Sequence, residues 1–476
     1  MSGAGAEVAV GGAAVGELVG SRTVRGWIVD PVSEREGPGE IRIGDGVIRG
    51  LDWLDSPGGA DIRADGVLIA PGFVDLHTHL REPGNEDAET VASGLAAAAH
   101  GGFTTVCAMP NTTPPADDPA VVGRVQAAAD ASGSPVRLVA YGCVSAARAG
   151  EALAPLGELA DAGVVGFSDD GAPVRSAALF RNALLYAGSL GLPLVEHAED
   201  PALTAGAEMH DGYVATVLGL RGWPVAGEVA AVARAVALLE DVVRDEPRAR
   251  LHLTHVSTAA ALAIVRDAKA RGLPLTCDVA PHHLALSDEW VAGSRRWAWE
   301  AVDERGRARD PWADGALTAS PYDPATRVNP PLRSPEDAIA CLAALADGTA
   351  DAVATDHAPH TVVDKDVEYG LAANGISGLE TALGCLLAAV DAGRLTLARA
   401  VEALTVGPAR VLGARVPVPG IRVGDPADLV VVDRGTAWRV EPDALRSKGM
   451  NTPLLRRELR GVVRLTVAAG RIAYTA

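Results

Sequence analysis

Short apolar stretches and longer stretches with helical spacing alternate through most of the chain. The apolar stretches predict strands at 72–79, 103–109, 136–143, 164–169, 193–197, 251–255, 273–279 and 352–356. Segments with the apolar spacing of helices follow, such as 90–100, 121–131, 176–190, 229–243, 259–271, 335–346 and 378–392. Eight such units in succession predict an α/β fold, a (β/α)8 TIM-type barrel. A doubly wound open sheet is the competing architecture, but no G-x-G-x-x-G motif opens a helix to support it.

Both ends of the chain show short strands and tight turns without a helical period. We expect residues 22–70 and 416–476 to form one small β-sandwich domain, because the termini of a domain often lie close together. The barrel would then occupy residues 71–415. Residues 1–21 are rich in Ala, Gly and Val and lack the basic start of a secretory signal, so we expect a disordered leader.

Composition narrows the class of protein. The 476 residues carry a formal net charge of -19, and no basic cluster is present to neutralise phosphates, which argues against nucleic acid or an anionic membrane as a partner. No apolar run is long enough to span a bilayer. The five cysteines are scattered, which is typical of reduced thiols in a cytoplasmic protein. Lysine occurs only at positions 269, 365 and 448.

Polar residues stand where the predicted strands end. His77 and His79 are two residues apart, so they lie on one face of their strand and can hold one divalent metal. A lone His-x-His is usually just two histidines at a strand end. The ends of the other strands change that judgement, because they carry Asn111, Asp169/Asp170, His197, His255, His282/His283 and Asp356. In a barrel, the carboxyl ends of the strands build the active site.

Four imidazoles and two carboxylates exceed what one catalytic metal needs. They suit two ions bridged by a carboxylate and a hydroxide, an arrangement that hydrolyses a bond without a protein nucleophile. Asp356 could take the proton of the hydroxide and return it to the leaving nitrogen. A serine nucleophile is disfavoured, because the chain has no G-x-S-x-G motif.

Several motifs together resemble the dihydroorotase family of the cyclic amidohydrolase superfamily. They begin with Pro-Gly-Phe-Val-Asp-Leu-His-Thr-His at 71–79 and Gly-Gly-Phe-Thr-Thr-Val-Cys-Ala-Met-Pro-Asn-Thr at 101–112. The others are 168–171, 255–257, 281–284, 328–334, 354–360 and 424–433. The resemblance runs from about residue 27 to the end of the chain. It implies the reversible interconversion of N-carbamoyl-L-aspartate and L-dihydroorotate in pyrimidine biosynthesis.

The resemblance also implies a set of metal ligands. It assigns His77, His79 and Asp356 to one Zn²⁺ and His197 and His255 to a second, so that each subunit would hold two. Asp170 would bridge the ions, although strand alternation alone leaves Asp169 open. Many relatives bridge with a carbamylated lysine, but no lysine lies at a barrel strand end here. The chain is therefore similar to the branch that bridges with aspartate.

Further residues are assigned to the substrate by the same resemblance. Arg81, Asn111 and His360 would bind the carboxylate of the substrate, beside the metal ligand His79. Arg81 suits this role because a guanidinium can donate two parallel hydrogen bonds to a carboxylate. Asn329 and the backbone near Asn374 and Gly375 would hold the edge of the pyrimidine ring. We expect at least a homodimer, and the resemblance implies a larger assembly with aspartate transcarbamoylase.

Two alternatives stay open at this point. A hydantoinase, dihydropyrimidinase or allantoinase would share the barrel and the metals, but an uncharged ring substrate has no use for Arg81. An inactive scaffold for aspartate transcarbamoylase would have lost metal ligands, and none is missing here.

A Trp-rich stretch at 290–325 is longer than relatives usually carry, and we expect it to cover the site or to contact another subunit.

Overall fold

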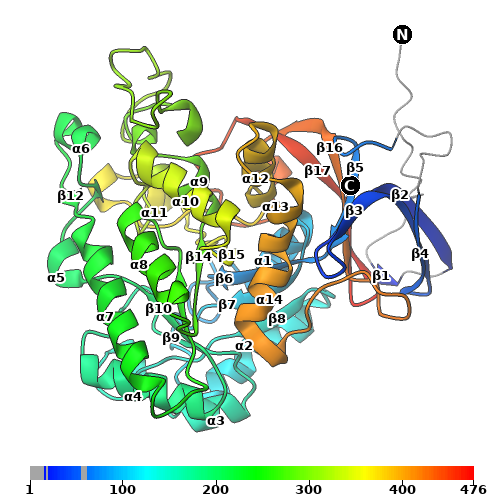
Figure 1. The fold of residues 1–476 in the computed structure, drawn as a ribbon, viewed down its shortest axis with the longest axis horizontal. Helices are drawn as coiled ribbons and strands as arrows, with labels where there is room; N and C mark the ends of the chain where they lie inside the picture. The colour runs from blue at the N-terminus through cyan, green and yellow to red at the C-terminus, as the bar shows by residue number, and fades with distance from the viewer. Residues whose placement is uncertain (1–15, 18–19, 55–61) are drawn as a thin grey trace.

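The computed structural model describes residues 16–17, 20–54 and 62–476. It consists of a large helical layer around a central barrel and a smaller sheet at one side (Figure 1). Most of the predicted leader, over residues 1–21, lies outside the described residues. Within the described part of the chain, no helix combines the length and the apolar character needed to cross a membrane.

Eight parallel strands close into the predicted barrel, which is confirmed. They are β6 (Phe73–Thr78), β7 (Phe103–Ala108), β8 (Arg137–Ala140), β9 (Phe167–Ser168), β10 (Leu194–His197), β13 (Leu251–Thr254), β14 (Leu275–Val279) and β15 (Ala352–Val353). They form two parallel runs, β6-β7-β8 and β9-β10-β13-β14-β15. Single parallel bridges, Gly142 to Phe167 and Thr78 to His357, join the runs and complete the ring.

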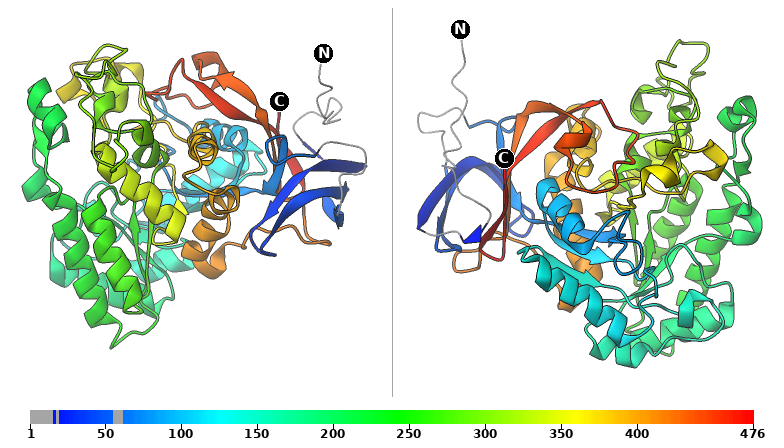
Figure 2. Two further views of the ribbon diagram at one scale, coloured as in Figure 1. Left: turned by 45° about the horizontal axis from the view of Figure 1, so that its top comes forward. Right: turned by 180° about the vertical axis from the view of Figure 1, so that it is seen from behind.

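Helices surround the barrel (Figure 2). The longer ones are α1 (Val91–Gly101), α2 (Pro119–Ser132), α4 (Ala177–Ser189), α7 (Ala226–Val242), α8 (Ala259–Ala270), α10 (Pro335–Asp347), α12 (Ala382–Asp391), α13 (Leu397–Leu404) and α14 (Val406–Leu412). Shorter ones are α3 (Leu156–Asp161), α5 (Pro201–Thr204), α6 (Tyr213–Leu218), α9 (Pro281–Ala285) and α11 (Val362–Lys365). Side-chain caps set their starts, as where Thr90 accepts a hydrogen bond from the backbone of Ser93. One continuous apolar core fills the space between helices and strands.

The two chain ends come together in one small β unit, as expected, but the strands of the expected β-sandwich are hydrogen-bonded as a single eight-stranded sheet. Its order is β1-β18-β17-β16-β5-β2-β3-β4. The bounds are β1 (Gly16–Glu17), β2 (Ser21–Asp30), β3 (Arg35–Gly44), β4 (Val47–Trp53), β5 (Val67–Pro71), β16 (Leu429–Arg439), β17 (Glu458–Ala468) and β18 (Arg471–Thr475). The sheet encloses its own apolar cluster, which includes Ile28, Ile41 and Val467. Strand β5 runs directly into β6, and Gly72 allows this junction, because a Cβ there would lie 2.2 Å from the Thr104 side chain.

The Trp-rich stretch is packed against the protein. Trp290 is fully buried, and the guanidinium of Arg457 lies 3.7 Å from the ring centre of Trp297 and 5.4 Å from that of Trp290. Val291 packs with apolar residues of α6 and of β11 (Met209–His210), the strand that pairs with β12 (Gly222–Trp223), and with Tyr369. This packing ties the stretch to the segment before β17. Whether it also contacts another subunit stays a hypothesis.

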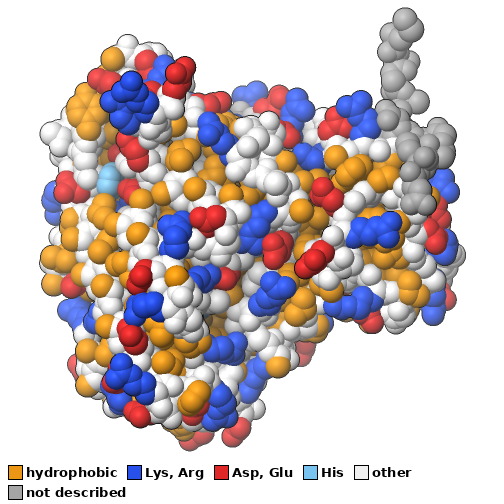
Figure 3. Space-filling view, in the orientation of Figure 1, with side chains coloured by type: hydrophobic (Ala, Val, Ile, Leu, Met, Phe, Trp, Pro, Cys, Tyr) orange, Lys and Arg blue, Asp and Glu red, His pale blue; other side chains and the backbone are white. Residues whose placement is uncertain are grey.

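The face of the molecule drawn in Figure 3 carries acidic and basic side chains side by side. Neither sign forms a continuous stripe on that face. Exposed apolar side chains are scattered between them, as is usual for a folded protein surface.

Candidate metal centre

The six predicted ligands come together at the carboxyl ends of the barrel strands. His77 lies in β6 and His197 ends β10, while His79, Asp170, His255 and Asp356 follow their strands within three residues. All six are nearly buried, with exposed fractions of 0% for His77 and at most 6% for the others. The strands therefore deliver residues far apart in sequence to one end of the barrel, as this fold requires.

Within this cluster, His77, His79 and Asp356 form one group. Nε2 of His77 lies 3.1 Å from Nε2 of His79 and 3.4 Å from Oδ1 of Asp356. Nε2 of His79 lies 3.3 Å from the same oxygen of Asp356. Three potential ligand atoms thus face one point, and they lie within 4.8 Å of one another.

Asp170 lies between this group and a second pair of histidines. Its Oδ2 is 3.4 Å from Nε2 of His77 and 3.5 Å from Nε2 of His79. Its Oδ1 is 3.5 Å from Nδ1 of His197 and 3.6 Å from Nε2 of His255, and these two imidazole nitrogens are 3.1 Å apart. One oxygen of Asp170 therefore faces each group, which is the arrangement of a bridging carboxylate.

The neighbouring Asp169 faces away from the cluster. Its Oδ1 accepts hydrogen bonds from the backbone N–H groups of Val144 at 2.8 Å and Ser145 at 3.2 Å. Its Oδ2 accepts the hydroxyl of Ser145. The geometry therefore favours Asp170 over Asp169 as the bridge, a choice that strand alternation left open.

The outer partners of two imidazoles, those of His77 and His79, turn lone pairs towards the cluster. Nδ1 of His77 donates to Oγ1 of Thr254 at 2.9 Å, because that hydroxyl itself donates to Asp278 at 3.1 Å. Nδ1 of His79 is 2.9 Å from Oδ1 of Asn111, which can only accept. In a neutral imidazole the other nitrogen then carries a lone pair, the form that binds a metal.

The electrostatics of the cluster match a site for cations. Burial alone would lower the pKa of His77, but the carboxylates of Asp170 and Asp356 raise it to about 9. The neighbouring His77, His79 and His255 lower the pKa of Asp356, although burial acts in the opposite direction. A buried oxygen of Asp170, Oδ1, has no hydrogen-bond partner among the described residues. A divalent cation would satisfy that oxygen and replace the protons on the imidazoles.

Strained backbone marks three residues of the site. Arg81, His255 and Asp356 have φ angles of 60°, 39° and 47°, in the left-handed region that residues with a side chain rarely adopt. Such conformations are held only where the surrounding structure determines them, and they are common at active sites. They turn these side chains out of the regular strand direction and into the site.

A cavity of about 220 Å³ opens beside the cluster. It is lined by every residue that the sequence assigned to substrate, namely His79, Arg81, Asn111, Asn329, His360, Asn374 and Gly375. Arg81 is half-buried there; it donates through Nε to the carbonyl of Pro359 at 3.0 Å, and Nη2 lies 3.2 Å from Nε2 of His360. Burial and the charge of Arg81 lower the pKa of His360 to about 4, so His360 is neutral at pH 7.

Some residues at the site were missed by the sequence analysis. Glu199 accepts from Nε2 of His197, and Asp278 accepts from Thr254 and from the backbone of His255. Neither belongs to a recognisable pattern beyond its position near a strand end. His282 and His283, which we expected to support the site or pack, are buried; Nε2 of His283 donates to the carbonyl of Pro330 at 3.0 Å.

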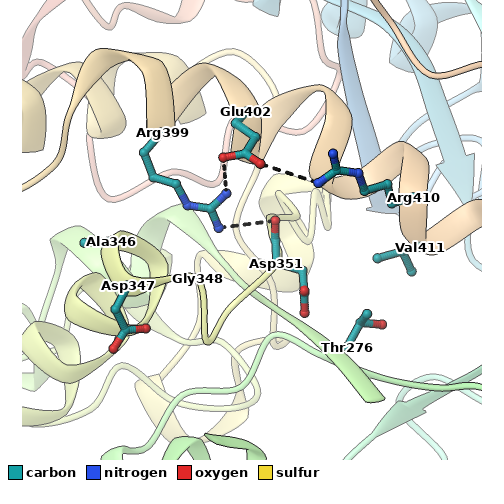
Figure 4. A pocket seen from close by; sticks show the side chains of 10 residues that line it. Thr276, Ala346, Asp347, Gly348, Asp351, Arg399, Glu402, Arg410 and Val411 are labelled. Atoms are coloured by element: carbon teal, nitrogen blue, oxygen red, sulfur yellow. Dashed lines mark hydrogen bonds and ion pairs between the residues drawn. The ribbon is translucent and has the colours of Figure 1, made fainter. Parts of the chain in front are cut away.

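A larger cavity, of about 440 Å³, lies at the other end of the barrel strands (Figure 4). Its central cation, Arg399, donates to Glu402 at 2.9 Å and to the carbonyls of Leu345 and Ala350. Arg410 also lies 3.6 Å from Glu402. These groups satisfy one another, so this cavity offers no unpartnered charge comparable to those at the metal centre.

Comparison with known proteins points to one family. Residues 66–259 match the family model described as dihydro-orotase-like. A dihydroorotase of Anaeromyxobacter dehalogenans (strain 2CP-1) is 47% identical over 451 residues, covering 94% of this chain and 96% of that protein. A dihydroorotase of Pelotomaculum thermopropionicum is 43% identical over 449 residues, covering 94% and 96%.

Solved structures of related enzymes have the same fold. The L-hydantoinase (dihydropyrimidinase) of Arthrobacter aurescens superposes with a TM-score of 0.75 at 25% identity, covering 94% of each chain. The dihydropyrimidinase of Brevibacillus agri superposes with a TM-score of 0.73 at 19% identity, covering 96% of this chain and 95% of that one. The extent and identity of the sequence matches place this chain in the dihydroorotase family of metal-dependent cyclic amidohydrolases.

Proposed function

We propose that this protein is a dihydroorotase that interconverts N-carbamoyl-L-aspartate and L-dihydroorotate. The observation that carries the proposal is the position of Arg81 at the cavity wall without a carboxylate partner. Its side chain is half-buried at the cavity wall, and among the described residues no carboxylate lies within ion-pair distance of its guanidinium. A cation that is half removed from water and has no anionic partner is stabilised by one, so this position favours a substrate that brings its own carboxylate. Dihydroorotate has one; hydantoin and dihydrouracil do not.

The metal centre in this proposal holds two Zn²⁺ ions per subunit. His77, His79 and Asp356 would hold one ion, His197 and His255 the other, with Asp170 between them. When bound, such ions lower the pKa of water and polarise a carbonyl group. The inward lone pairs of the imidazoles and the unpartnered oxygen of Asp170 support this assignment.

The chain's own residues supply orientation and proton transfer. Arg81, Asn111 and neutral His360 bind the substrate carboxylate and so place the ring amide over the cluster. Asp356 takes a proton from the attacking water and gives it to the ring nitrogen that leaves. In the reverse direction the same carboxylate removes a proton from the ureido nitrogen as the ring closes. The backbone at Asn374 and Gly375 bounds the ring edge.

Substrate preference tests the proposal. The purified full chain, loaded with Zn²⁺, should open dihydroorotate at a rate well above that for hydantoin, measured by loss of ring absorbance. A chelator should abolish turnover, and added Zn²⁺ should restore it. Faster turnover of hydantoin would assign the chain to the alternative activity. No turnover at full metal occupancy, with transcarbamoylase present, would indicate a scaffold.

The same proposal includes the cellular compartment of the enzyme and its assembly with other subunits. We infer a cytoplasmic homodimer that can associate with aspartate transcarbamoylase, whose product is carbamoyl aspartate. Five buried free cysteines support a reducing compartment. Light scattering of the chain alone and mixed with that partner tests the assembly. A single monomeric species in both samples would contradict it.

A further inference from the structure

Glu199 lies just behind the metal centre. It follows β10 by two residues, and its side chain is 12% exposed. It does not line the cavity, yet its carboxylate has three partners: His197, Asn329 and the hydroxyl of Thr204. Two of these partners do line the cavity, so Glu199 connects a predicted metal ligand to a predicted substrate residue.

The first connection fixes the tautomer of His197. Oε2 of Glu199 lies 2.9 Å from Nε2 of His197 and can only accept, so Nε2 carries the proton. In the neutral imidazole that binds a metal, Nδ1 then keeps its lone pair towards Asp170 and His255. This is the nitrogen that would bind the second metal ion, and an anchored imidazole binds more tightly than a free one.

The second connection fixes the amide of Asn329. The same oxygen, Oε2, accepts a hydrogen bond from Nδ2 of Asn329 at 2.9 Å. The amide cannot turn over, because its oxygen would then face a carboxylate. Oδ1 of Asn329 is therefore held on the other side, where it is buried and has no hydrogen-bond partner in the described part of the chain.

An unsatisfied acceptor at a cavity wall selects what can bind there. Oδ1 of Asn329 needs a donor, because a buried acceptor left unpaired is destabilising. The N–H groups of a cyclic amide, or of the ureido group of the opened product, are donors of the required kind. A ring that offered only acceptors at this edge would be rejected.

We propose that Glu199 is a positioning residue that sets both the tautomer of His197 and the direction of the Asn329 amide. One carboxylate thus prepares a metal ligand and a substrate acceptor at the same time. This inference rests on the proposed function for the identity of the substrate, but its effect on the metal does not require turnover.

Four variants separate the two connections: Glu199→Ala, Glu199→Gln, Asn329→Ala and the double variant Glu199→Ala/Asn329→Ala. Zn²⁺ retention is measured by competition with a chelator, and kcat and KM for dihydroorotate are measured at full Zn²⁺ occupancy. Asp200→Asn is the matched control, because Asp200 caps α5 through the backbone of Ala202 and Asn is an equally good cap. Unfolding temperatures show whether each variant is folded.

We expect Glu199→Ala to weaken Zn²⁺ binding about 10–100-fold, as for other outer partners of metal-binding histidines. It should also raise KM about tenfold, as expected for a lost hydrogen bond of this kind. In the Asn329→Ala background, the same change should leave KM unaltered and still weaken Zn²⁺ binding. Glu199→Gln keeps an accepting oxygen and should restore most of both properties.

Three results would overturn the inference. They are wild-type Zn²⁺ retention and KM in Glu199→Ala, additive KM effects in the double variant, or equal damage in Glu199→Gln and Glu199→Ala. Failure of the proposed function gives a different result, because wild-type protein would then lack dihydroorotate turnover. The Zn²⁺ competition would still report on the connection to His197.

Discussion

Asp170 approaches the two histidine groups with different oxygens: Oδ1 is 3.5 Å from Nδ1 of His197, and Oδ2 is 3.4 Å from Nε2 of His77. Replacement of Asp170 by Asn should therefore disturb both groups at once. We expect loss of Zn²⁺ and a fall in kcat of at least about 100-fold, since the bridge contributes charge to both positions. Metal content by mass spectrometry and steady-state kinetics measure the two effects.

Asp169→Asn is the matched control for that prediction, because it changes the adjacent carboxylate. It should lower the unfolding temperature through the weakened bonds to Val144 and Ser145, and leave Zn²⁺ content intact. If the Asp169 variant loses Zn²⁺ and the Asp170 variant keeps it, the bridge has been assigned to the wrong residue.

Asp356→Asn should slow the chemical step while substrate still binds. Asn cannot move the proton, and general acid–base catalysis typically contributes about 100- to 10,000-fold. We expect kcat to fall by that order with a small change in KM, measured at saturating Zn²⁺ because Asp356 is also a predicted ligand. An unchanged kcat would remove Asp356 from the proton transfer.

Arg81→Lys should raise KM for dihydroorotate about 10- to 100-fold. Lysine keeps the charge but loses the planar two-point contact with a carboxylate. The slower background activity on hydantoin should be nearly unchanged, because that ring has no carboxylate to lose. Equal losses of activity on both substrates would mean that Arg81 supports the site without binding the substrate carboxylate.

His210 should make the protein less stable in acid. Burial and the nearby charge of Arg333 lower its pKa from 6.5 to about 3. The unfolded chain binds a proton at this position below pH 6.5, whereas the folded protein does not until about pH 3. The free energy of unfolding therefore falls as pH decreases through this range, by up to about 1.4 kcal/mol per pH unit for one such group.

Urea unfolding of wild-type protein and His210→Gln between pH 6.5 and 4 measures that contribution. The variant should lose stability less steeply than wild type as the pH falls. His252→Gln is a suitable comparison, since it removes another buried histidine, whose Nε2 lies 2.8 Å from Oδ2 of Asp278. Parallel pH profiles for wild type and His210→Gln would show that His210 does not titrate as expected.

Strand and helix periodicity predicted the barrel well, because each unit buries its apolar side against its neighbours. The ends of the strands were less predictable. The stretch 352–356 reads as one strand, but β15 stops at Val353 and Asp356 adopts a φ of 47°. Such a turn depends on contacts with β6, which the local sequence does not contain.

The sequence by itself determined the barrel, the sheet from both chain ends and the set of histidines and carboxylates that meet at one end. It could do so because strand ends in a barrel converge whatever the loops do. Only the tertiary structure shows that Asp170 faces both histidine groups while Asp169 faces away, and only it revealed Glu199 and Asp278. These depend on the direction of single side chains across 20 to 130 positions of sequence, and such directions are set by packing, not by local pattern.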